Sequence, residues 1–482
     1  MIAERTAGGE SEAAATRRRT KIVATLGPAS QDERVLGQLL EAGMDVARIN
    51  LSHGTTDEHA DAIAAVRRGA ARRGAPLAIL IDLPGPKLRL GDLPQPLAVR
   101  AGESVVLGPP PAAQLPVNFP ELLPHFTAGE LVLIDDGAVA LRVSAVSPSA
   151  VTLEVLNDGV IESRKGVNLP DTRLPIGALT AADRELLAWG LRQDVDYVAL
   201  SFVRSADDVR ELKELIAAAG GDQLVIAKIE KKEALAVHDE IIAVADAVMV
   251  ARGDLGVEID PPMVPIWQKR IIHAANVAGK PVITATQMLQ SMISSPRPTR
   301  AEASDVANAI YDATSAVMLS GETAIGGYPV EAVRTMAGIA LAVEADIKRE
   351  GRAPQPWAVG RTGVSNAISY GACEVAHRVG AAAIISATFS GATAHAVARN
   401  LPAQPIVAVS TNQRVVNQLA LCWGVSPLLG THRGSFEEVV LEANDLVLGN
   451  GFAQRGQVVV VTAGLQSNQT GKTNLIKAHV LD

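Results

Sequence analysis

The chain has 482 residues, of which 48% are hydrophobic and 20% charged, so it can bury a large core and is not a disordered protein. Its 44 Lys and Arg against 52 Asp and Glu give a formal charge of −8, which argues against a nucleic-acid partner. Two cysteines, Cys373 and Cys422, cannot form a disulfide framework, and a reducing cytoplasm is the simplest compartment. No apolar run is long enough to span a bilayer, so we expect no membrane partner.

The first 19 residues are rich in Ala, Gly, Glu and Arg and contain no apolar stretch. We therefore expect residues 1–19 to be a flexible tail and not a secretory signal. We interpret its three consecutive arginines, Arg17 to Arg19, as solvated charge.

Eight short β-branched segments follow, and each precedes a stretch whose composition is typical of a helix. The segments are 21–27, 45–52, 77–83, 196–202, 224–230, 247–253, 281–287 and 315–322. Strand–helix alternation repeated eight times predicts a parallel (β/α)₈ TIM barrel formed by residues 20–86 and 172–344. A doubly wound open sheet is the alternative. The glycine-rich dinucleotide fingerprint that such a sheet often carries after its first strand is absent from this sequence.

Two further regions interrupt and follow this pattern. Residues 87–171 are rich in Pro, Gly and Val with short alternating runs, which predicts a small all-β domain inserted after the third strand. From residue 345 to 482, strand-like segments again alternate with helix-like ones, which predicts a separate C-terminal α/β domain.

Polar residues gather where the predicted barrel strands end. Because side chains two apart on a strand point the same way, several pairs should share a face. They are Arg48, Asn50 and Ser52; Lys228 and Glu230; Arg252 and Asp254; Thr284 and Thr286; and Asp82 with Lys87 and Arg89 beyond it. Catalytic groups of barrel enzymes lie at this end of the strands. A single pair could be a structural ion pair, but polar residues at five strand ends favour a functional site.

The residue types indicate the chemistry. Glu230 and Asp254 are hard oxygen ligands suited to Mg²⁺ or Mn²⁺. Arg48, Arg89 and Lys228 could hold a phosphate and neutralise developing negative charge. A metal and cations at one point suggest phosphoryl transfer or stabilisation of an enolate. No Walker-type phosphate loop is present, so a nucleotide would be held in another way.

The motifs of this chain resemble those of the pyruvate kinase family. Among them are TKIVATLGPAS (20–30), GMDVARINLSHG (43–54), KGVNLP (165–170), VIAKIE (225–230), VMVARGDLGVEI (248–259), ITATQMLQSMI (283–293), MLSGETAIGGYP (318–329) and GKTNLIKAHVL (471–481). The resemblance runs from about residue 20 to the end of the chain. It implies transfer of the phosphoryl group of phosphoenolpyruvate to ADP, giving pyruvate and ATP.

The resemblance also implies roles for single residues. The metal would be held by Glu230 and Asp254, and the phosphoryl group would be contacted by Arg48 and Lys228. Lys228 would also stabilise the enolate, and Arg89 would be a further catalytic cation. Substrate would be bound by Gly253, Asp254 and Thr286, with Thr286 on the route of the proton. The nucleotide side would include Asn50, His53 and Lys165, with Lys165 reaching in from the inserted domain.

One motif departs from the commoner family pattern. In many members K⁺ is held by groups that match Asn50, Ser52, Asp82 and the backbone of residue 83, and the segment that begins at the position of Asp82 resembles D-T-K-G-P-E-I-R. Here the segment reads DLPGPKLR (82–89), with Leu83 for the threonine and Lys87 for the glutamate. A second group with leucine and lysine at these places is associated with K⁺ independence. An ammonium can supply the charge of a bound K⁺. We therefore expect no K⁺ requirement.

Other inferences stay open at this point. The loop with Thr388, Ser390, Gly391 and Thr393 could bind a phosphorylated effector, as in the family, or could be an ordinary strand-to-helix turn. A homotetramer is usual in the family. A metal-dependent lyase or aldolase acting on pyruvate enolate is the alternative function, and it would need neither Lys165 nor a lid.

Overall fold

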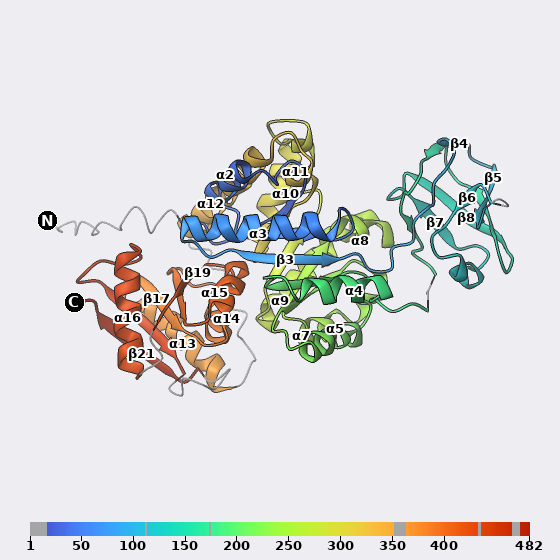
Figure 1. Ribbon diagram of the computed structural model, residues 1–482. Helices are drawn as coiled ribbons and strands as arrows, with labels where there is room; N and C mark the ends of the chain where they lie inside the picture. The colour runs from blue at the N-terminus through green and yellow to red at the C-terminus, as the bar shows by residue number, and fades with distance from the viewer. Residues whose placement is uncertain (1–16, 111–112, 173–174, 351–362, 432–434, 465–472) are drawn as a thin grey trace.

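The computed structural model describes residues 17–110, 113–172, 175–350, 363–431, 435–464 and 473–482. Figure 1 shows three units: a central barrel, an all-β unit on the right, and an α/β unit at the lower left. The predicted barrel and C-terminal α/β domain are confirmed. Strand β3 (Ala78–Leu83) points toward the all-β unit, so that unit lies at the carboxyl end of the strands (Figure 1).

The barrel is a closed sheet of eight parallel strands in the order β1-β16-β15-β14-β13-β12-β3-β2. Besides β3, its strands are β1 (Lys21–Leu26), β2 (Val46–Asn50), β12 (Tyr197–Leu200), β13 (Leu224–Ile229), β14 (Ala247–Ala251), β15 (Val282–Ala285) and β16 (Ala316–Leu319). The helical segments of this unit are α2 (Glu33–Ala42), α3 (Thr56–Arg73), α4 (Ala181–Gly190), α5 (Ala206–Ala218), α6 (Lys232–Ala236), α7 (His238–Val244), α8 (Arg252–Glu258), η2 (Pro261–Met263), α9 (Val264–Ala278), η3 (Gln290–Ile293), α10 (Arg300–Tyr311), α11 (Gly321–Ala324) and α12 (Pro329–Arg349).

Alternate strand residues divide between two apolar layers. One layer fills the barrel interior and includes Val23, Val46, Leu80, Ile226 and Met249. The other lies between the strands and the helices and includes Ile22, Ala47, Ile79, Ala227 and Val248. This period of two is what an extended backbone dictates. It also decides which polar side chains at the strand ends face inward.

Local sequence sets where several helices begin. At each of these N-termini a Ser or Thr side chain accepts from the backbone N–H three residues on, and the acidic side chain there returns the bond. The pairs are Thr55 with Glu58, Thr180 with Asp183, Ser205 with Asp208, Thr299 with Glu302, and Ser435 with Glu438. These capping boxes hold α3, α4, α5 and α10 in their places around the barrel.

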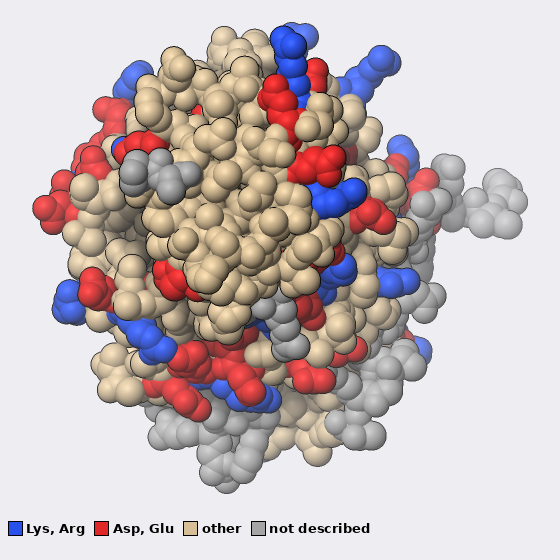
Figure 2. Space-filling model, turned by 90° about the vertical axis from the view of Figure 1, so that its right-hand side faces the viewer, with Lys and Arg blue, Asp and Glu red and all other residues tan. Residues whose placement is uncertain are grey.

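The inserted unit is built from short strands that alternate buried and exposed residues. Its six-stranded sheet has the order β11-β7-β8-β9-β5-β6, and β10 pairs with β4 beside it. The elements are β4 (Leu97–Val99), β5 (Ser104–Gly108), β6 (Leu115–Pro116), η1 (Pro120–His125), β7 (Leu131–Ile134), β8 (Val139–Val146), β9 (Val151–Val155), β10 (Gly159–Ile161) and β11 (Val167–Asn168). Figure 2 shows the molecule from the side on which the inserted unit lies. Uncharged residues fill the centre of this face, and charged residues of both signs surround it.

The C-terminal unit is a five-stranded sheet in the order β19-β18-β17-β20-β21, in which β21 alone runs antiparallel. Its elements are α13 (Val364–Arg378), β17 (Ala383–Ala387), α14 (Ala392–Ala398), β18 (Ile406–Ser410), α15 (Gln413–Gln418), η4 (Leu419–Leu421), β19 (Val425–Leu429), α16 (Phe436–Gly449), β20 (Val458–Ala463) and β21 (Leu475–Val480). Among the described residues, no helix is both long and apolar enough to cross a membrane.

The C-terminal unit closes the amino end of the barrel. Ala420 and Leu421, both in η4, belong to the same apolar cluster as the barrel interior. Inside that end, the Tyr197 hydroxyl donates to the carbonyl oxygen of Gln418 at 2.7 Å, and Lys21 Nζ donates to that of Val425 at 2.7 Å. The two units therefore share one core and buried hydrogen bonds.

Arg17 and Arg19, near the N-terminus, take part in this junction, and Arg18 between them pairs within the barrel. Arg18 pairs with Asp45 at 2.7 Å, and the Arg19 guanidinium donates to the carbonyls of Pro402 and Ala403 in the C-terminal unit. The Arg17 guanidinium lies 3.9 Å from the ring centroid of Phe452. The interpretation of this run as solvated charge is therefore wrong for Arg18 and Arg19, which are partly buried and paired, whereas Arg17 is exposed.

Candidate active site

Polar side chains replace apolar ones on the inward face where the barrel strands end. Arg48 follows Val46 on β2, Asp82 follows Leu80 on β3, and Lys228 follows Ile226 on β13. Their Cβ atoms point inward because each stands two residues after an interior apolar residue. Closure of the barrel brings the three strands around one space at the carboxyl end.

Asp82 lies between the two cations of this cluster. Its Oδ2 accepts from Arg48 Nε at 2.8 Å and lies 2.7 Å from another guanidinium nitrogen, while Lys228 Nζ lies 3.5 Å from Oδ1. Burial opposes ionisation of this carboxyl, but the charges of Lys228 and Arg48 outweigh it and lower the pKa of Asp82. Asp82 therefore stays an anion that anchors both cations.

Lys228 is nearly buried among three carboxylates. Its Nζ lies 3.2 Å from Glu230 Oε2. Burial acts to lower the pKa of Lys228, but the charges of Asp82, Glu230 and Asp254 outweigh it and raise that pKa. The side chain is therefore a permanent cation at the mouth of the barrel.

Asp254 comes to this cluster from the first turn of α8. Its Oδ1 accepts from Lys87 Nζ at 2.9 Å. Burial opposes its ionisation, but the charges of Lys87 and Lys228 prevail and lower the pKa of Asp254. Asp254 is thus ionised and close to Glu230, whose pKa its charge helps to raise.

Glu230 and Asp254 fit a divalent cation. Glu230 is 1% exposed; its Oε1 accepts from the backbone N–H of Phe202 at 2.8 Å, while Oε2 accepts no hydrogen bond. Burial, offset in part by Lys228, raises the pKa of Glu230, so this carboxylate is short of positive charge. Among the described residues, no group of three or more His, Cys, Asp or Glu forms a metal cage. Two carboxylates would leave most positions on Mg²⁺ open to water and substrate.

The expected pairing of Arg252 with Asp254 on one strand face is wrong. Strand β14 ends at Ala251, and α8 begins at Arg252. The Arg252 guanidinium turns toward the helices and bonds to Asp305 at 2.7 Å and to the carbonyl of Thr286 at 2.8 Å. The helical backbone sends neighbouring side chains in different directions.

Thr284 and Thr286 do not share a face either. Thr284 is buried outside the barrel interior, where its hydroxyl lies 2.9 Å from that of Thr314. Thr286 follows the end of β15 with a φ of 70°, in the left-handed region. Its Oγ1 accepts from the backbone N–H of Gly253 at 2.7 Å, so Thr286 and Gly253 lie together beside Asp254.

Asn50 is the last residue of β2, and Ser52 and His53 lie on the segment that follows it. Asn50 Oδ1 accepts from the backbone N–H of Ser52 at 3.2 Å. Partial burial, together with the charges of Arg89, Arg48 and Lys87, lowers the pKa of His53. The imidazole is therefore neutral and faces the cations of the cluster.

The two cations that the insert was expected to bring to the site, Arg89 and Lys165, bond to residues of the insert itself. Arg89 forms an isolated bridge with Gly166, and its guanidinium donates to the carbonyl of Arg164 at 3.3 Å. Lys165 Nζ lies 3.1 Å from Asp135 and 3.2 Å from Glu162, both in the same unit. In this arrangement the ammonium of Lys165 is paired within the insert, and no contact among the described residues brings it to the barrel cluster.

Sequence reasoning did not single out two hydroxyls of the site, Thr25 and Ser201. Arg48 donates to Thr25 Oγ1 at 2.9 Å, and Lys228 donates to Ser201 Oγ at 2.7 Å. The period-two rule could have found them, because Thr25 follows Val23 on β1 and Ser201 follows Ala199 after β12.

The loop before α14 has one buried and one exposed part. Gly391 has a φ of 83°, and the Thr393 hydroxyl is buried 2.8 Å from that of Thr473. Thr388 donates its backbone N–H to the carbonyl of Val409 at 3.0 Å, and Ser390 is exposed. Thr393 thus serves packing within the unit, while Ser390 faces solvent.

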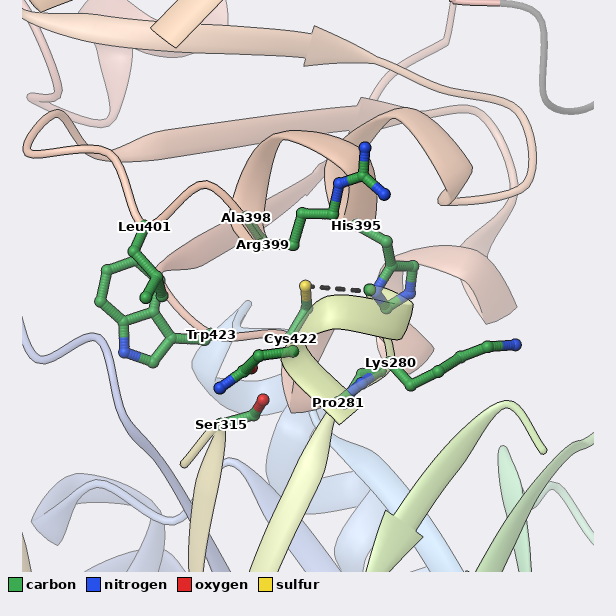
Figure 3. A pocket seen from close by; sticks show the side chains of 11 residues that line it. Lys280, Pro281, Ser315, His395, Ala398, Arg399, Leu401, Cys422 and Trp423 are labelled. Atoms are coloured by element: carbon green, nitrogen blue, oxygen red, sulfur yellow. Dashed lines mark hydrogen bonds between the residues drawn. The ribbon is translucent and has the colours of Figure 1, made fainter. Parts of the chain in front are cut away.

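A pocket lies at the other end of the barrel, against the C-terminal unit (Figure 3). Cys422 Sγ lies 3.3 Å from His395 Nδ1 there, along the dashed line in Figure 3. Burial raises the pKa of Cys422 to about 12 and lowers the pKa of His395 to about 4. Both groups are neutral near pH 7, so they do not form the ion pair of a nucleophilic cysteine.

Comparison with known proteins identifies the family. Residues 17–333 match the family model "Pyruvate kinase, barrel domain", and residues 366–479 match "Pyruvate kinase, alpha/beta domain". Over 96% of its length the chain is 45% identical to a pyruvate kinase of Geobacillus stearothermophilus, of which it covers 81%. It is 41% identical to one of Clostridium acetobutylicum, of which it covers 100%, and 45% identical to pyruvate kinase 2 of Synechocystis sp., of which it covers 79%. The chain belongs to the pyruvate kinase family.

Proposed function

We propose that the inward cluster of Arg48, Asp82, Lys228, Glu230 and Asp254 is the phosphoryl-transfer site of the enzyme. Membership of the family makes the chain a phosphotransferase, with phosphoenolpyruvate and ADP as substrates. The single observation that carries the assignment is Lys228, a buried permanent cation set among Asp82, Glu230 and Asp254. The alternative of a lyase or aldolase is set aside, because the relatives are pyruvate kinases over nearly the whole chain.

We assign the steps to residues by charge and position. Arg48 and Lys228 would hold the phosphoryl oxygens and neutralise charge that develops in transit. Lys228 would also face the enolate oxygen left when the phosphoryl group departs. Glu230 and Asp254 would hold Mg²⁺ or Mn²⁺, which supplies Lewis-acid charge for the phosphate and carboxylate of the substrate. Thr286, with Gly253 beside it, would contact the substrate on the proton-delivery side.

We propose that His53, Asn50 and Arg89 lie on the nucleotide side. Neutral His53 lies within reach of the charges of Arg89, Arg48 and Lys87. Lys165 would join only when the insert, which we delimit as residues 87–171 between barrel segments 20–86 and 172–344, moves toward the strand ends. Its pairs with Asp135 and Glu162 are partly exposed, so exchanging them for ADP phosphates costs little. Such closure would exclude water from the phosphoryl group.

We propose that the enzyme needs no K⁺. The support is the contact of Lys87 Nζ with Asp254, which puts a covalently held cation beside one of the two proposed metal carboxylates. Asn50, Ser52, Asp82 and the backbone of Leu83 lie in the same region, but Asp82 is already paired with Arg48 and Lys228.

Three wider proposals concern an effector site, the oligomeric state and the compartment. The loop with Thr388, Ser390 and Gly391 is our candidate for a phosphorylated effector, with exposed Ser390 as its contact. We also propose a homotetramer in the cytoplasm, where buried Cys373 and Cys422 would stay reduced. Effector titration against rate and light scattering test the first two.

Pyruvate release from phosphoenolpyruvate, measured with and without ADP and Mg²⁺, tests the function. We expect release to depend on both. Lys228→Met should lower kcat at least about a hundredfold, because it removes charge from the reacting centre. Lys213→Met is a matched control, since Lys213 pairs with Asp246 at 2.7 Å on the helical layer. Pyruvate formation without ADP, or an unaffected Lys228 variant, would contradict the assignment.

A further inference from the structure

Two buried hydroxyls make the same pattern of hydrogen bonds at the site. The Ser201 hydroxyl is 2% exposed; it donates to the carbonyl of Leu83 at 2.7 Å and accepts from Lys228 Nζ at 2.7 Å. The Thr25 hydroxyl is 3% exposed; it donates to the carbonyl of Leu319 at 2.9 Å and accepts from Arg48 Nη1 at 2.9 Å. Lys228 and Arg48 thus each donate a hydrogen bond to one buried hydroxyl.

A hydroxyl has one proton and two acceptor lone pairs. In Ser201 and Thr25 the proton goes to a backbone carbonyl of a neighbouring strand; the other acceptor near the Ser201 hydroxyl, Asp82 Oδ1, is farther away at 3.4 Å. The hydroxyl oxygen then accepts a hydrogen bond from the cation. Its lone pairs are oriented by the hydrogen bond that the hydroxyl donates to the barrel backbone. Leu200 pairs in register with Leu83, and Thr25 pairs with Arg48 itself, so the geometry is part of the sheet.

Asp82 cannot supply this direction by itself. Its carboxylate is shared between Arg48 and Lys228, and the lysine nitrogen lies as far as 3.5 Å from it. Charge attraction of this kind is weakly directional, and a lysine side chain has many rotamers to lose. A neutral acceptor fixes the ammonium without cancelling the charge that phosphoryl transfer needs.

We propose that Thr25 and Ser201 are positioning residues, which aim Arg48 and Lys228 at the phosphoryl group and the enolate oxygen. The inference rests on the function proposed above and deepens it. Ser201 acts through Lys228, and Thr25 acts through Arg48. A small misplacement of a catalytic group lowers rate far more than stability, so the two roles can be separated experimentally.

The barrel offers a matched control. Thr284 is as buried as Thr25, and its hydroxyl is also hydrogen-bonded, in this case to the hydroxyl of Thr314, but it faces the helical layer. Thr25→Val and Thr284→Val make the same chemical change. We expect both to lower Tm to a similar degree, and only Thr25→Val to lower kcat, by about tenfold or more. Thr25→Ser keeps the hydroxyl and should restore kcat.

Ser201→Ala should lower kcat by about tenfold to a hundredfold with a smaller change in KM for phosphoenolpyruvate. Ser201→Cys keeps the side-chain size but hydrogen-bonds weakly, so it should show the same defect even if the alanine variant folds poorly. Loss of packing alone would move Tm without this split between kcat and KM.

Exchange of the pyruvate methyl protons for deuterium in D₂O, followed by NMR, measures the rate of enolate formation without a phosphoryl-transfer step. In this exchange a C–H bond breaks, its proton passes to the solvent and the enolate is left; a C–D bond then forms with deuterium from D₂O. Because Lys228 faces the enolate oxygen, Ser201→Ala should slow the exchange, and Thr25→Val should slow it less. If wild type forms no pyruvate with ADP, the proposed function fails. If wild type is active and both variants match Thr284→Val, the positioning role is overturned.

Discussion

The ammonium nitrogen of Lys87 lies 2.9 Å from Oδ1 of Asp254, although 167 positions of sequence separate the two residues. Lys87 follows β3, at the start of the insert, and Asp254 lies in the first turn of α8. The contact places a fixed positive charge beside the carboxylate of Asp254. It is the structural basis for expecting an enzyme that works without a monovalent cation.

Lys87→Glu should convert the enzyme to one that responds to K⁺. We expect wild-type rates in Na⁺ or an organic cation to match those in K⁺ at equal ionic strength. The variant adds negative charge where a positive charge stood, so it should be slow in Na⁺ and several-fold faster in K⁺. Lys213→Glu makes the same charge reversal at another Lys–Asp pair, where the two groups lie 2.7 Å apart, and its rate should not depend on K⁺. Strong stimulation of the wild type by K⁺ would contradict this view.

Glu230→Gln should weaken divalent-metal binding by about tenfold or more, since a charged ligand becomes neutral. Mn²⁺ binding followed by electron paramagnetic resonance measures this without relying on turnover. Glu258→Gln is the control, because Glu258 is also buried (4% exposed) but is paired with Lys231 at 2.6 Å. Equal loss of Mn²⁺ affinity in both variants would argue against Glu230 as a ligand.

Leu421→Ala should destabilise the protein by about 2–5 kcal/mol, because it leaves a cavity in the end of the barrel. Leu421 is 0% exposed and belongs to the barrel-interior cluster, although it comes from the C-terminal unit. Leu441→Ala on α16, where the leucine is 64% exposed, should change Tm little. Calorimetry of the two variants checks this, and similar melting curves would show that η4 does not support the barrel.

Asp196 should make stability fall as pH rises from about 4 to about 6. Burial, only partly offset by Arg67, raises the pKa of Asp196 from 3.8 to about 6. Between these values the folded state keeps a proton that the unfolded state has released, so rising pH favours unfolding. The effect amounts to at most roughly 3 kcal/mol.

Asp196→Asn removes this titration. Relative to the variant, the wild type should lose stability between about pH 4 and about pH 6, as measured by urea denaturation. Asp207→Asn, at a carboxylate 87% exposed, should run parallel to the wild type across the same range. If the free energies of unfolding of wild type and Asp196→Asn differ by the same amount at every pH, the raised pKa of Asp196 is refuted.

Much of the fold could be read from sequence because it depends on local rules. Period-two alternation placed Arg48, Asp82 and Lys228 on one inward face, and the structure agrees for these residues because they lie within extended strands. The same rule failed for Arg252 and Thr286. At the first the backbone has become helical, and at the second it has entered the left-handed region.

The sequence by itself determined the types of residue at the strand ends, the succession of barrel strands and the kinship of the motifs. Only the tertiary structure decided which partners meet. It showed that Lys87 pairs with Asp254, that Thr25 accepts a hydrogen bond from Arg48 and Ser201 one from Lys228, and that Arg19 donates to a carbonyl of the C-terminal unit. It also showed Lys165 paired inside the insert. The physical reason is that strand periodicity fixes a side chain's direction only within its own strand. Contacts across strands and units depend on barrel closure and on how loops and domains pack.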